Sequence, residues 1–218
     1  AGTGQFPSSA EVVVIGAGIV GNCLSGHLAE MGWNDIVLLD KGPLPNPGGS
    51  TGHASNFIFP VDHNKEMAFL TLESQRQYEA LGLNTTCGGI EVARTPERMQ
   101  ELLRRMTSAK AWGIGAYLLA PAQINEKGPF IHEAILLGGF YTPSVSVVDS
   151  LETGTVMRRR AQEAGALQVF ANTEVTALEV VDGAIAAVVT NRGRIGCTHV
   201  AIACGVWSPR LATMAGAT

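Results

Sequence analysis

The sequence predicts an α/β fold, in which a parallel sheet is flanked by helices and accompanied by an antiparallel meander. Two patterns carry this prediction. Residues 12–40 read as a strand, a glycine-rich turn, a helix and a second strand, which makes the two strands parallel and the crossover right-handed. Near the end of the chain, Asp182-Gly183 is a hairpin signal between short segments rich in valine and alanine.

The composition is that of a globular protein large enough to bury a sizeable core. The chain has 218 residues, of which 46% are hydrophobic and 16% are charged. The net charge of −4 leaves no basic footprint for nucleic acid, and we interpret the arginines at 158–160 as a solvated helix face. The apolar run at 12–20 is too short for a membrane span and lacks the flanks of a signal peptide.

The four cysteines predict reduced, structural thiols. They form no CxxC pair and have no metal-type spacing with a histidine, so no metal site is predicted. Reduced thiols favour a cytoplasmic location, or the mitochondrial matrix in a eukaryote. Residues 1–9 are expected to be an unstructured lead-in, and we expect the rest of a longer chain to follow Thr218.

The remaining elements follow from apolar periodicity, caps and turn residues. Predicted helices cover residues 19–31, 65–81, 95–112 and 150–165, and predicted strands cover residues 12–15, 36–39, 88–94 and 199–203. Residues 113–140 are expected to be irregular. The predicted domains are a first part of the dinucleotide-binding domain (10–85), a partial α+β insertion (86–142) and a second part of the binding domain (143–218).

The turn after the first strand has the spacing GxGxxG, which is typical of a diphosphate-binding loop. The first glycine permits the tight turn, the second lets the backbone approach a diphosphate, and the third allows close packing of helix and strand. The N-terminus of the following helix offers free N–H groups and a partial positive charge. The candidate residues are Gly16, Ala17, Gly18, Ile19, Val20 and Gly21.

Asp40 ends the second strand, where a carboxylate can accept hydrogen bonds from a ribose diol and would repel a 2′-phosphate. The alternative interpretation of Asp40 is a simple strand-end residue. Lys41 is a candidate charge beside the adenosine. FAD and NAD share the adenosine and diphosphate, so this fingerprint leaves a flavoprotein and a nicotinamide dehydrogenase both open.

The segment Pro-Gly-Gly-Ser-Thr-Gly-His-Ala-Ser-Asn at 47–56 favours the flavoprotein. With it, the chain resembles the FAD-dependent glycine oxidase/D-amino-acid oxidase group, and within it most closely the dimethylglycine dehydrogenase, dimethylglycine oxidase and sarcosine dehydrogenase branch. The likeness runs through nearly the whole chain and includes residues 12–21, 38–43, 48–54, 88–93, 111–113, 137–139 and 204–207. It implies a Rossmann-like, glutathione-reductase-like FAD-binding fold.

The resemblance also implies further cofactor contacts. A Ser/Thr-rich loop runs along the diphosphate and ribityl chain in this group, the backbone near Val175 grips adenine, and the returning strand passes beneath the cofactor. In some members a histidine at the position of His53 is joined covalently to the flavin; a noncovalent contact or a loop hydrogen bond is the alternative. These additional candidates are Gly49, Ser50, Thr51, Gly52, His53, Phe57, Val175, Ala203 and Gly205.

The activity implied by the resemblance is oxidation of a small N-methylated amino acid, such as dimethylglycine or sarcosine, by hydride transfer to flavin N5. Oxygen or an electron-transfer flavoprotein would then reoxidise the flavin. No residue of this chain is predicted to be the catalytic acid or base, because relatives carry those side chains later in the sequence. The alternatives are a non-catalytic regulatory relative of the same fold and an NAD-dependent dehydrogenase.

Overall fold

The computed structural model describes residues 5–216 and contains two compact units. One unit joins the chain up to Ala54 with the chain from Ser150 onward, and the other is Ser55–Asp149. The second unit is longer than the expected insertion at 86–142, because short strands near residues 57 and 84 pair with a strand at 146–148 inside it.

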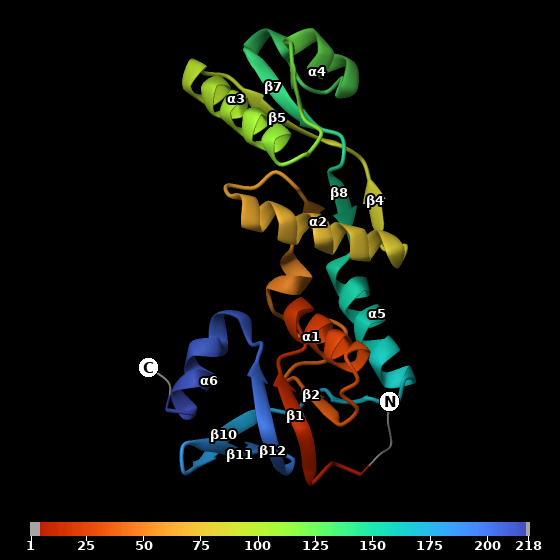
Figure 1. The fold of residues 1–218 in the computed structure, drawn as a ribbon, viewed down its shortest axis with the longest axis vertical. Helices are drawn as coiled ribbons and strands as arrows, with labels where there is room; N and C mark the ends of the chain where they lie inside the picture. Colours follow the sequence, from red (N-terminus) through yellow and green to blue (C-terminus); the bar gives the residue numbers. More distant parts are fainter. Residues whose placement is uncertain (1–4, 217–218) are drawn as a thin grey trace. The chain divides into compact units, whose positions relative to one another are not determined.

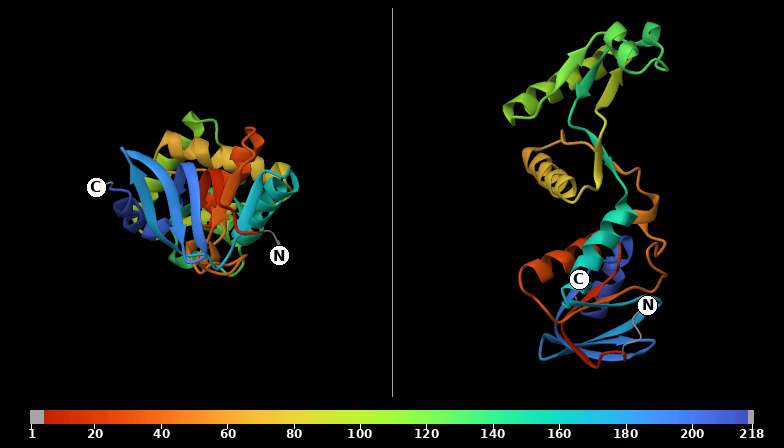
Figure 2. Two further views of the ribbon diagram at one scale, coloured as in Figure 1. Left: turned by 90° about the horizontal axis from the view of Figure 1, so that it is seen from below. Right: turned by 90° about the vertical axis from the view of Figure 1, so that its right-hand side faces the viewer.

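A six-stranded mixed sheet forms the first unit (Figure 1), with the strand order β10-β11-β12-β1-β2-β9. Its strands are β1 (Ser9–Ile15), β2 (Ile36–Leu39), β9 (Leu167–Phe170), β10 (Val175–Val181), β11 (Ala184–Thr190) and β12 (Gly193–Ile202). Strands β12, β1, β2 and β9 are parallel, and β10 and β11 are antiparallel additions. The left view of Figure 2 shows these additions side by side. The α/β fold with a meander is therefore confirmed.

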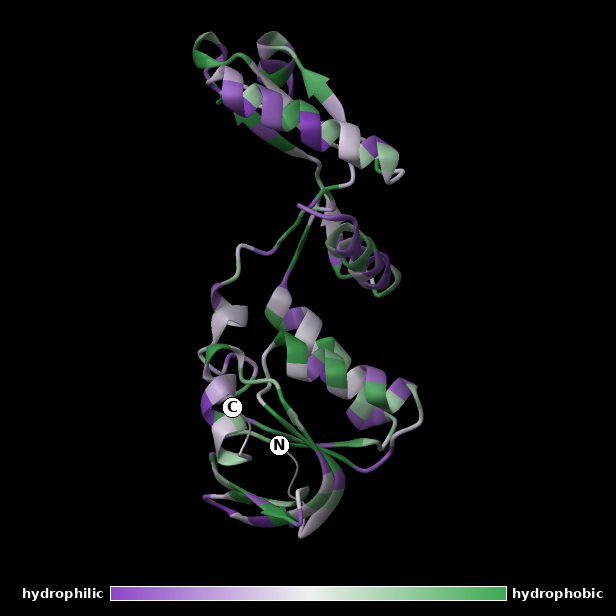
Figure 3. Ribbon diagram, turned by 60° about the vertical axis from the view of Figure 1, so that its left-hand side comes forward, coloured by the Kyte–Doolittle hydropathy of each residue, from purple (hydrophilic) through white to green (hydrophobic). Residues whose placement is uncertain are grey.

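The central strands are apolar because both faces of the sheet are covered. Val13 and Val37 belong to a cluster on one face, whereas Val14 and Leu38 belong to a cluster on the other, and all four have no exposed surface. Figure 3 shows this concentration of hydrophobic residues along the middle of the sheet. The carboxyl ends of β1 and β2 are thus held rigidly, and the predicted turn begins there.

Strand β12 differs from the expected short strand at 199–203. It is continuous from Gly193, so one strand serves both the meander and the parallel sheet: it pairs antiparallel with β11 and parallel with β1. β1 also begins earlier than residue 12, because Ser9 pairs with Gly196. The hairpin between β10 and β11 lies at Asp182-Gly183 as predicted, with φ of 52° and 78°.

Helices α1 (Ile19–Glu30) and α5 (Ser150–Glu163) pack side by side in this unit (Figure 1). The close approach requires a small residue, because a Cβ on Gly26 would lie 2.8 Å from Cε of Met157. The unit also contains the 3-10 helices η1 (Ser50–His53) and η3 (Gly205–Trp207) and helix α6 (Ser208–Met214).

The prediction that all three arginines at 158–160 of α5 are solvated is wrong for Arg158. The side chains of Arg159 and Arg160 are 62% and 51% exposed, but Arg158 is buried at 8%. Arg158 lies on the face of α5 that also buries Gly154, Met157 and Ala161, because residues three and four apart share one side of a helix.

The second unit contains two three-stranded antiparallel sheets, β3-β8-β4 and β5-β7-β6. Its strands are β3 (Phe57–Ile58), β4 (Asn84–Thr86), β5 (Gly89–Ala93), β6 (Tyr117–Leu119), β7 (Gly138–Thr142) and β8 (Ser146–Val148). Its helices are α2 (Lys65–Ala80), α3 (Pro96–Ala111), α4 (Pro121–Lys127) and the 3-10 turn η2 (Glu133–Ile135). The expectation of irregular structure at 113–140 is therefore wrong: this stretch holds β6, α4, η2 and the start of β7.

Predicted helix starts in this unit are confirmed by their caps. The side chain of Thr95 accepts a hydrogen bond from the N–H of Arg98, and Asn64 accepts one from Met67. Helix α3 then buries Leu102 and Ala109 against Phe140 of β7. Across residues 5–216, no helix is both long enough and apolar enough to cross a bilayer.

Candidate dinucleotide-binding site

Two of the three glycines of the predicted turn, Gly16 and Gly21, are required by their surroundings. Gly16 has a φ of +105°, and a Cβ there would lie 2.4 Å from the carbonyl oxygen of Ala203 on the returning strand. A Cβ on Gly21 would lie only 1.8 Å from the carbonyl oxygen of Gly16. A Cβ on Gly18, whose φ is −69°, would lie 3.2 Å from the side-chain oxygen Oγ1 of Thr51. At Gly16 and Gly21 the turn therefore meets its neighbours backbone to backbone, which no residue with a Cβ permits.

Helix α1 presents its N-terminus at this turn. The N–H of Ile19 donates to Oγ1 of Thr51 at 2.9 Å. Within residues 5–216, the N–H groups of Gly18 and Val20 have no hydrogen-bond acceptor, and both residues line a pocket. Free N–H groups at the start of a 12-residue helix, together with the positive end of its dipole, form an anion-binding position.

Asp40 ties the end of β2 to the same turn. Its Oδ2 accepts from the N–H of Ala17 at 2.7 Å, and its Oδ1 accepts from the N–H of Gly42 at 2.8 Å. A carboxylate has about four lone-pair positions, so these two bonds leave acceptor capacity for a ribose hydroxyl. Asp40 thus has a structural role in the turn, and its contact with a ribose stays a prediction. Beside it, Nζ of Lys41 lies 5.0 Å from the centroid of the Trp207 ring.

A cavity of about 430 Å³ joins these groups within the first unit. Most of the predicted cofactor residues line it: Gly16, Gly18, Ile19, Val20, Asp40, Lys41, Gly49, Ser50, Thr51, Val175, Ala203 and Gly205. Its size is typical of a small-molecule site. Turn, carboxylate and Ser/Thr loop, which are far apart in the sequence, therefore share one cavity.

Five predicted residues do not line this cavity. Ala17 and Gly21 lie behind the turn, where Ala17 is 1% exposed. Gly52 packs against Asn46, since a Cβ there would lie 2.5 Å from Oδ1 of Asn46. Nδ1 of His53 is 3.1 Å from the carbonyl oxygen of Gly49 on an exposed part of the loop. The fifth, Phe57, belongs to the second unit.

One wall of the cavity comes from η3 and α6, and sequence reasoning predicted only Gly205 of it. The additional lining residues there are Cys204, Trp207, Arg210, Leu211 and Met214. The signal was the Trp-Ser-Pro sequence at 207–209, because proline near the start of a helix is a start signal. Burial, and then the nearby charge of Asp40, raise the pKa of Cys204.

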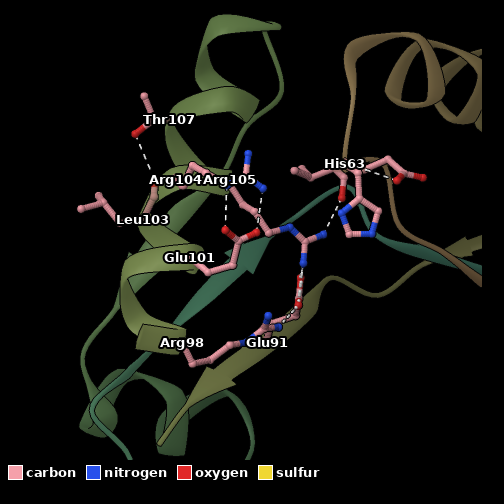
Figure 4. Close-up of polar contacts among 10 residues, drawn as sticks. His63, Glu91, Arg98, Glu101, Leu103, Arg104, Arg105 and Thr107 are labelled. Atoms are coloured by element: carbon pink, nitrogen blue, oxygen red, sulfur yellow. Dashed lines mark hydrogen bonds and ion pairs between the residues drawn. The ribbon is translucent and has the colours of Figure 1, made fainter. Parts of the chain in front are cut away.

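The second unit has its own smaller cavity of about 300 Å³. Glu91 and Arg105 line it, and they belong to an ion-pair cluster in which Glu91 accepts from both Arg98 and Arg105 (Figure 4). Arg105 also donates to the carbonyl oxygen of Val61, and its guanidinium lies 5.4 Å from the ring centroid of Phe59. Both terminal nitrogens of Arg105 thus have acceptors within the unit and only Nε has none, which indicates a structural role for the cluster.

The turn, the helix N-terminus and the carboxylate define a dinucleotide-binding protein. A family model described as FAD dependent oxidoreductase (DAO) matches residues 11–218, and the chain therefore belongs to that family. The expected cofactor, FAD, is confirmed by this membership, and the NAD-dependent alternative is set aside.

The chain is similar to several characterised proteins. It is 34% identical to mouse sarcosine dehydrogenase (Mus musculus, mitochondrial) over 97% of this chain and 24% of the relative. It is 29% identical to the mouse pyruvate dehydrogenase phosphatase regulatory subunit (Mus musculus, mitochondrial) over 94% of this chain and 24% of the relative. The crystal structure of L-proline dehydrogenase from P. horikoshii shares the fold, with a TM-score of 0.89 and 24% identity over 97% of this chain and 57% of that one. The chain thus spans about a quarter of the length of these curated relatives.

Thr51 offers a first test of the site. Thr51→Val removes the acceptor for the Ile19 N–H while keeping the shape of the side chain, and we expect FAD affinity to fall about fivefold, the order of one lost hydrogen bond. Thr51→Ser, which keeps the hydroxyl, should restore most of it. The matched control is Thr107→Val on α3, whose hydroxyl bonds a helix carbonyl in the other unit. A serine variant no better than valine, in a flavin fluorescence titration, would contradict this role.

Proposed function

We propose that the chain is the cofactor-binding portion of an FAD-dependent enzyme that oxidises small N-methylated amino acids of the sarcosine or dimethylglycine type. The observation that carries the proposal is the single cavity in which the GxGxxG turn, Asp40 and the Ser/Thr loop converge. Family membership supplies the cofactor, and the similarity to sarcosine dehydrogenase over nearly the whole chain supplies the substrate class. The names of the relatives support a mitochondrial location if the source is a eukaryote.

In this proposal the first unit holds and orients the cofactor. The N–H groups of Gly18 and Val20 bind the diphosphate, and Asp40 accepts from the adenosine ribose. The loop at 49–51 lies along the ribityl chain of the cofactor, toward the flavin ring. Bound FAD supplies the oxidising chemistry, accepting two electrons from the N-methyl carbon of the amine. The protein's contribution here is binding, orientation and charge compensation.

Two residues of the loop at 52–56 are explained by local backbone conformation and packing. Asn56 has a φ of 60°, the left-handed conformation that asparagine tolerates better than most residues. Gly52 is explained by its contact with Asn46. Nδ1 of His53 is 3.1 Å from the carbonyl oxygen of Gly49, and the proposed contact of this ring with the flavin is either covalent or noncovalent.

Acid precipitation separates these two roles of His53. Flavin colour that stays with the precipitated protein, and is lost from it in His53→Ala, assigns a covalent bond to this residue. Colour that passes into the supernatant excludes a covalent bond through His53, whose ring then keeps only its contact with the Gly49 carbonyl oxygen or a noncovalent contact with the flavin.

The substrate proposal is tested by anaerobic reduction of the full-length, FAD-loaded protein. We expect sarcosine or dimethylglycine to bleach the flavin absorbance, while glycine betaine, which has no removable N–H or lone pair, leaves it unchanged. Reoxidation by oxygen or by an electron-transfer flavoprotein then identifies the acceptor. A flavin-loaded protein inert to both amines would overturn the enzyme proposal.

That inert outcome would favour the second candidate, a non-catalytic regulatory protein of the same fold. The observation that supports this second candidate is the similarity to the phosphatase regulatory subunit. In this second candidate the chain keeps the FAD site and lacks only the amine chemistry. The absorbance spectrum of the resting protein is then the same for both candidates, and only the reduction experiment distinguishes them.

A further inference from the structure

Arg158 is a buried cation whose hydrogen-bond partners are neutral. Its Nη1 donates to Oδ1 of Asn22 at 3.2 Å, and its Nη2 is 3.4 Å from Oγ1 of Thr155. None of the ion pairs found between residues 5 and 216 includes it. Burial lowers the pKa of Arg158, yet a guanidinium stays charged in proteins. A buried charge with neutral partners destabilises a protein unless something compensates it.

Asn22 connects this charge to the diphosphate-binding turn. Its side chain is almost fully buried, and Nδ2 donates to the carbonyl oxygen of Ala17 at 2.7 Å. That carbonyl belongs to the same peptide group as the N–H of Gly18, which lines the cavity. Hydrogen bonds arranged in a chain polarise one another, so a guanidinium at one end strengthens the N–H donor at the other.

The close packing of α1 against α5 leaves room for these hydrogen bonds because α5 has a glycine opposite Asn22. A Cβ on Gly154 of α5 would lie 2.8 Å from Nδ2 of Asn22, so only glycine leaves room for the amide in its observed position. Arg158 follows Gly154 by four residues and therefore lies on the same face of α5, toward α1. Figure 1 shows the two helices side by side.

We propose that Arg158, acting through Asn22, is a positioning and charge-compensating residue for the diphosphate of FAD. It fixes the peptide between Ala17 and Gly18 in the orientation that aims the Gly18 N–H at the cavity, and it places a positive charge behind the turn. The diphosphate in turn supplies the negative charge that Arg158 lacks in the protein. This inference rests on FAD binding at the turn and is independent of the amine substrate.

The test compares ADP, which carries the diphosphate, with adenosine, which does not. Arg158→Met is measured by calorimetric titration beside Arg159→Met, an exposed arginine on the same helix. We expect Arg158→Met to weaken ADP binding about tenfold, the order of one hydrogen bond from a charged donor, and to leave adenosine binding unchanged. Arg159→Met should change neither, and Arg158→Lys should retain most of the ADP affinity because it keeps the charge.

A thermal melt without ligand supplies the readout that separates this role from a merely structural one. Arg158→Met removes a buried charge with neutral partners but also leaves Oδ1 of Asn22 without its donor. We therefore expect the unfolding midpoint of the apoprotein to change little and the upward shift caused by FAD to be smaller. Arg158→Gln, which keeps a donor for Asn22 but removes the charge, is measured in parallel and should show the same loss for ADP if the methionine variant does not fold.

Equal losses for ADP and adenosine, or unchanged affinity for both, would overturn the inference. A wild-type chain that bound no ADP at all would overturn it together with the cofactor site, whereas the substrate proposal is judged separately by the reduction experiment.

Discussion

Gly21→Ala is expected to abolish FAD binding and to destabilise the first unit by about 3 kcal/mol or more, the upper range for overpacking a core position. The added Cβ would lie 1.8 Å from the carbonyl oxygen of Gly16 and 3.0 Å from its carbonyl carbon. Both are backbone atoms of the turn, so no side chain can move aside. Helix α1 must shift away from β1, which carries its free N–H groups away from the cavity.

The measurements for this variant are the flavin retained after purification and the midpoint of thermal unfolding. Gly115→Ala is the matched control, because a Cβ there meets nothing within 4 Å and its φ is ordinary. We expect Gly115→Ala to behave like the wild type in both. A Gly21→Ala protein that bound FAD with wild-type affinity would contradict the close packing of turn and helix.

Asp40→Ala is expected to reduce FAD affinity about 100-fold. The substitution removes two charge-assisted hydrogen bonds, to the N–H groups of Ala17 and Gly42, and the proposed acceptor for the ribose diol. Asp40→Asn keeps one oxygen acceptor but turns an amide donor toward a second N–H. Its affinity for FAD should therefore lie between those of the wild type and Asp40→Ala. The measurement is a fluorescence titration with FAD.

Asp35→Ala is the control for Asp40→Ala. Asp35 lies just before the opposite end of β2, and its Oδ2 accepts from the N–H of Glu11 at 3.0 Å. Removing it costs a similar backbone contact away from the cavity, so stability should fall slightly and FAD affinity should not change. Equal losses of affinity in the two variants would show that Asp40 acts only through stability.

The diphosphate-binding turn could be predicted because its constraints are local. Gly16, Gly18 and Gly21 are fixed by strand, turn and helix within a few residues, and Asp40 follows from the length of one crossover. The wall formed by α6 was missed, because seven residues give too little periodicity to place a helix against a distant cavity. The short elements within 113–140 were missed for the same reason.

Arg158 shows a different limit. Three consecutive arginines suggest a solvated face, yet consecutive helix positions point in directions about 100° apart and cannot share one face. The spacing of Gly154, Met157, Arg158 and Ala161 indicates a buried stripe that could have been recognised in the sequence. What the sequence alone could not provide is the partner, since Asn22 lies on a helix 136 positions away.

The central claim is that the start of α1 and the end of β2 hold the diphosphate and adenosine of FAD. Backbone amide NMR shifts during titration with ADP test it most directly, because they locate the ligand residue by residue. The account predicts the largest shifts at the amides of Gly16, Gly18, Val20 and Lys41, with little change across Ser55–Asp149. Shifts concentrated in that second unit, or none at the turn under saturation, would contradict it.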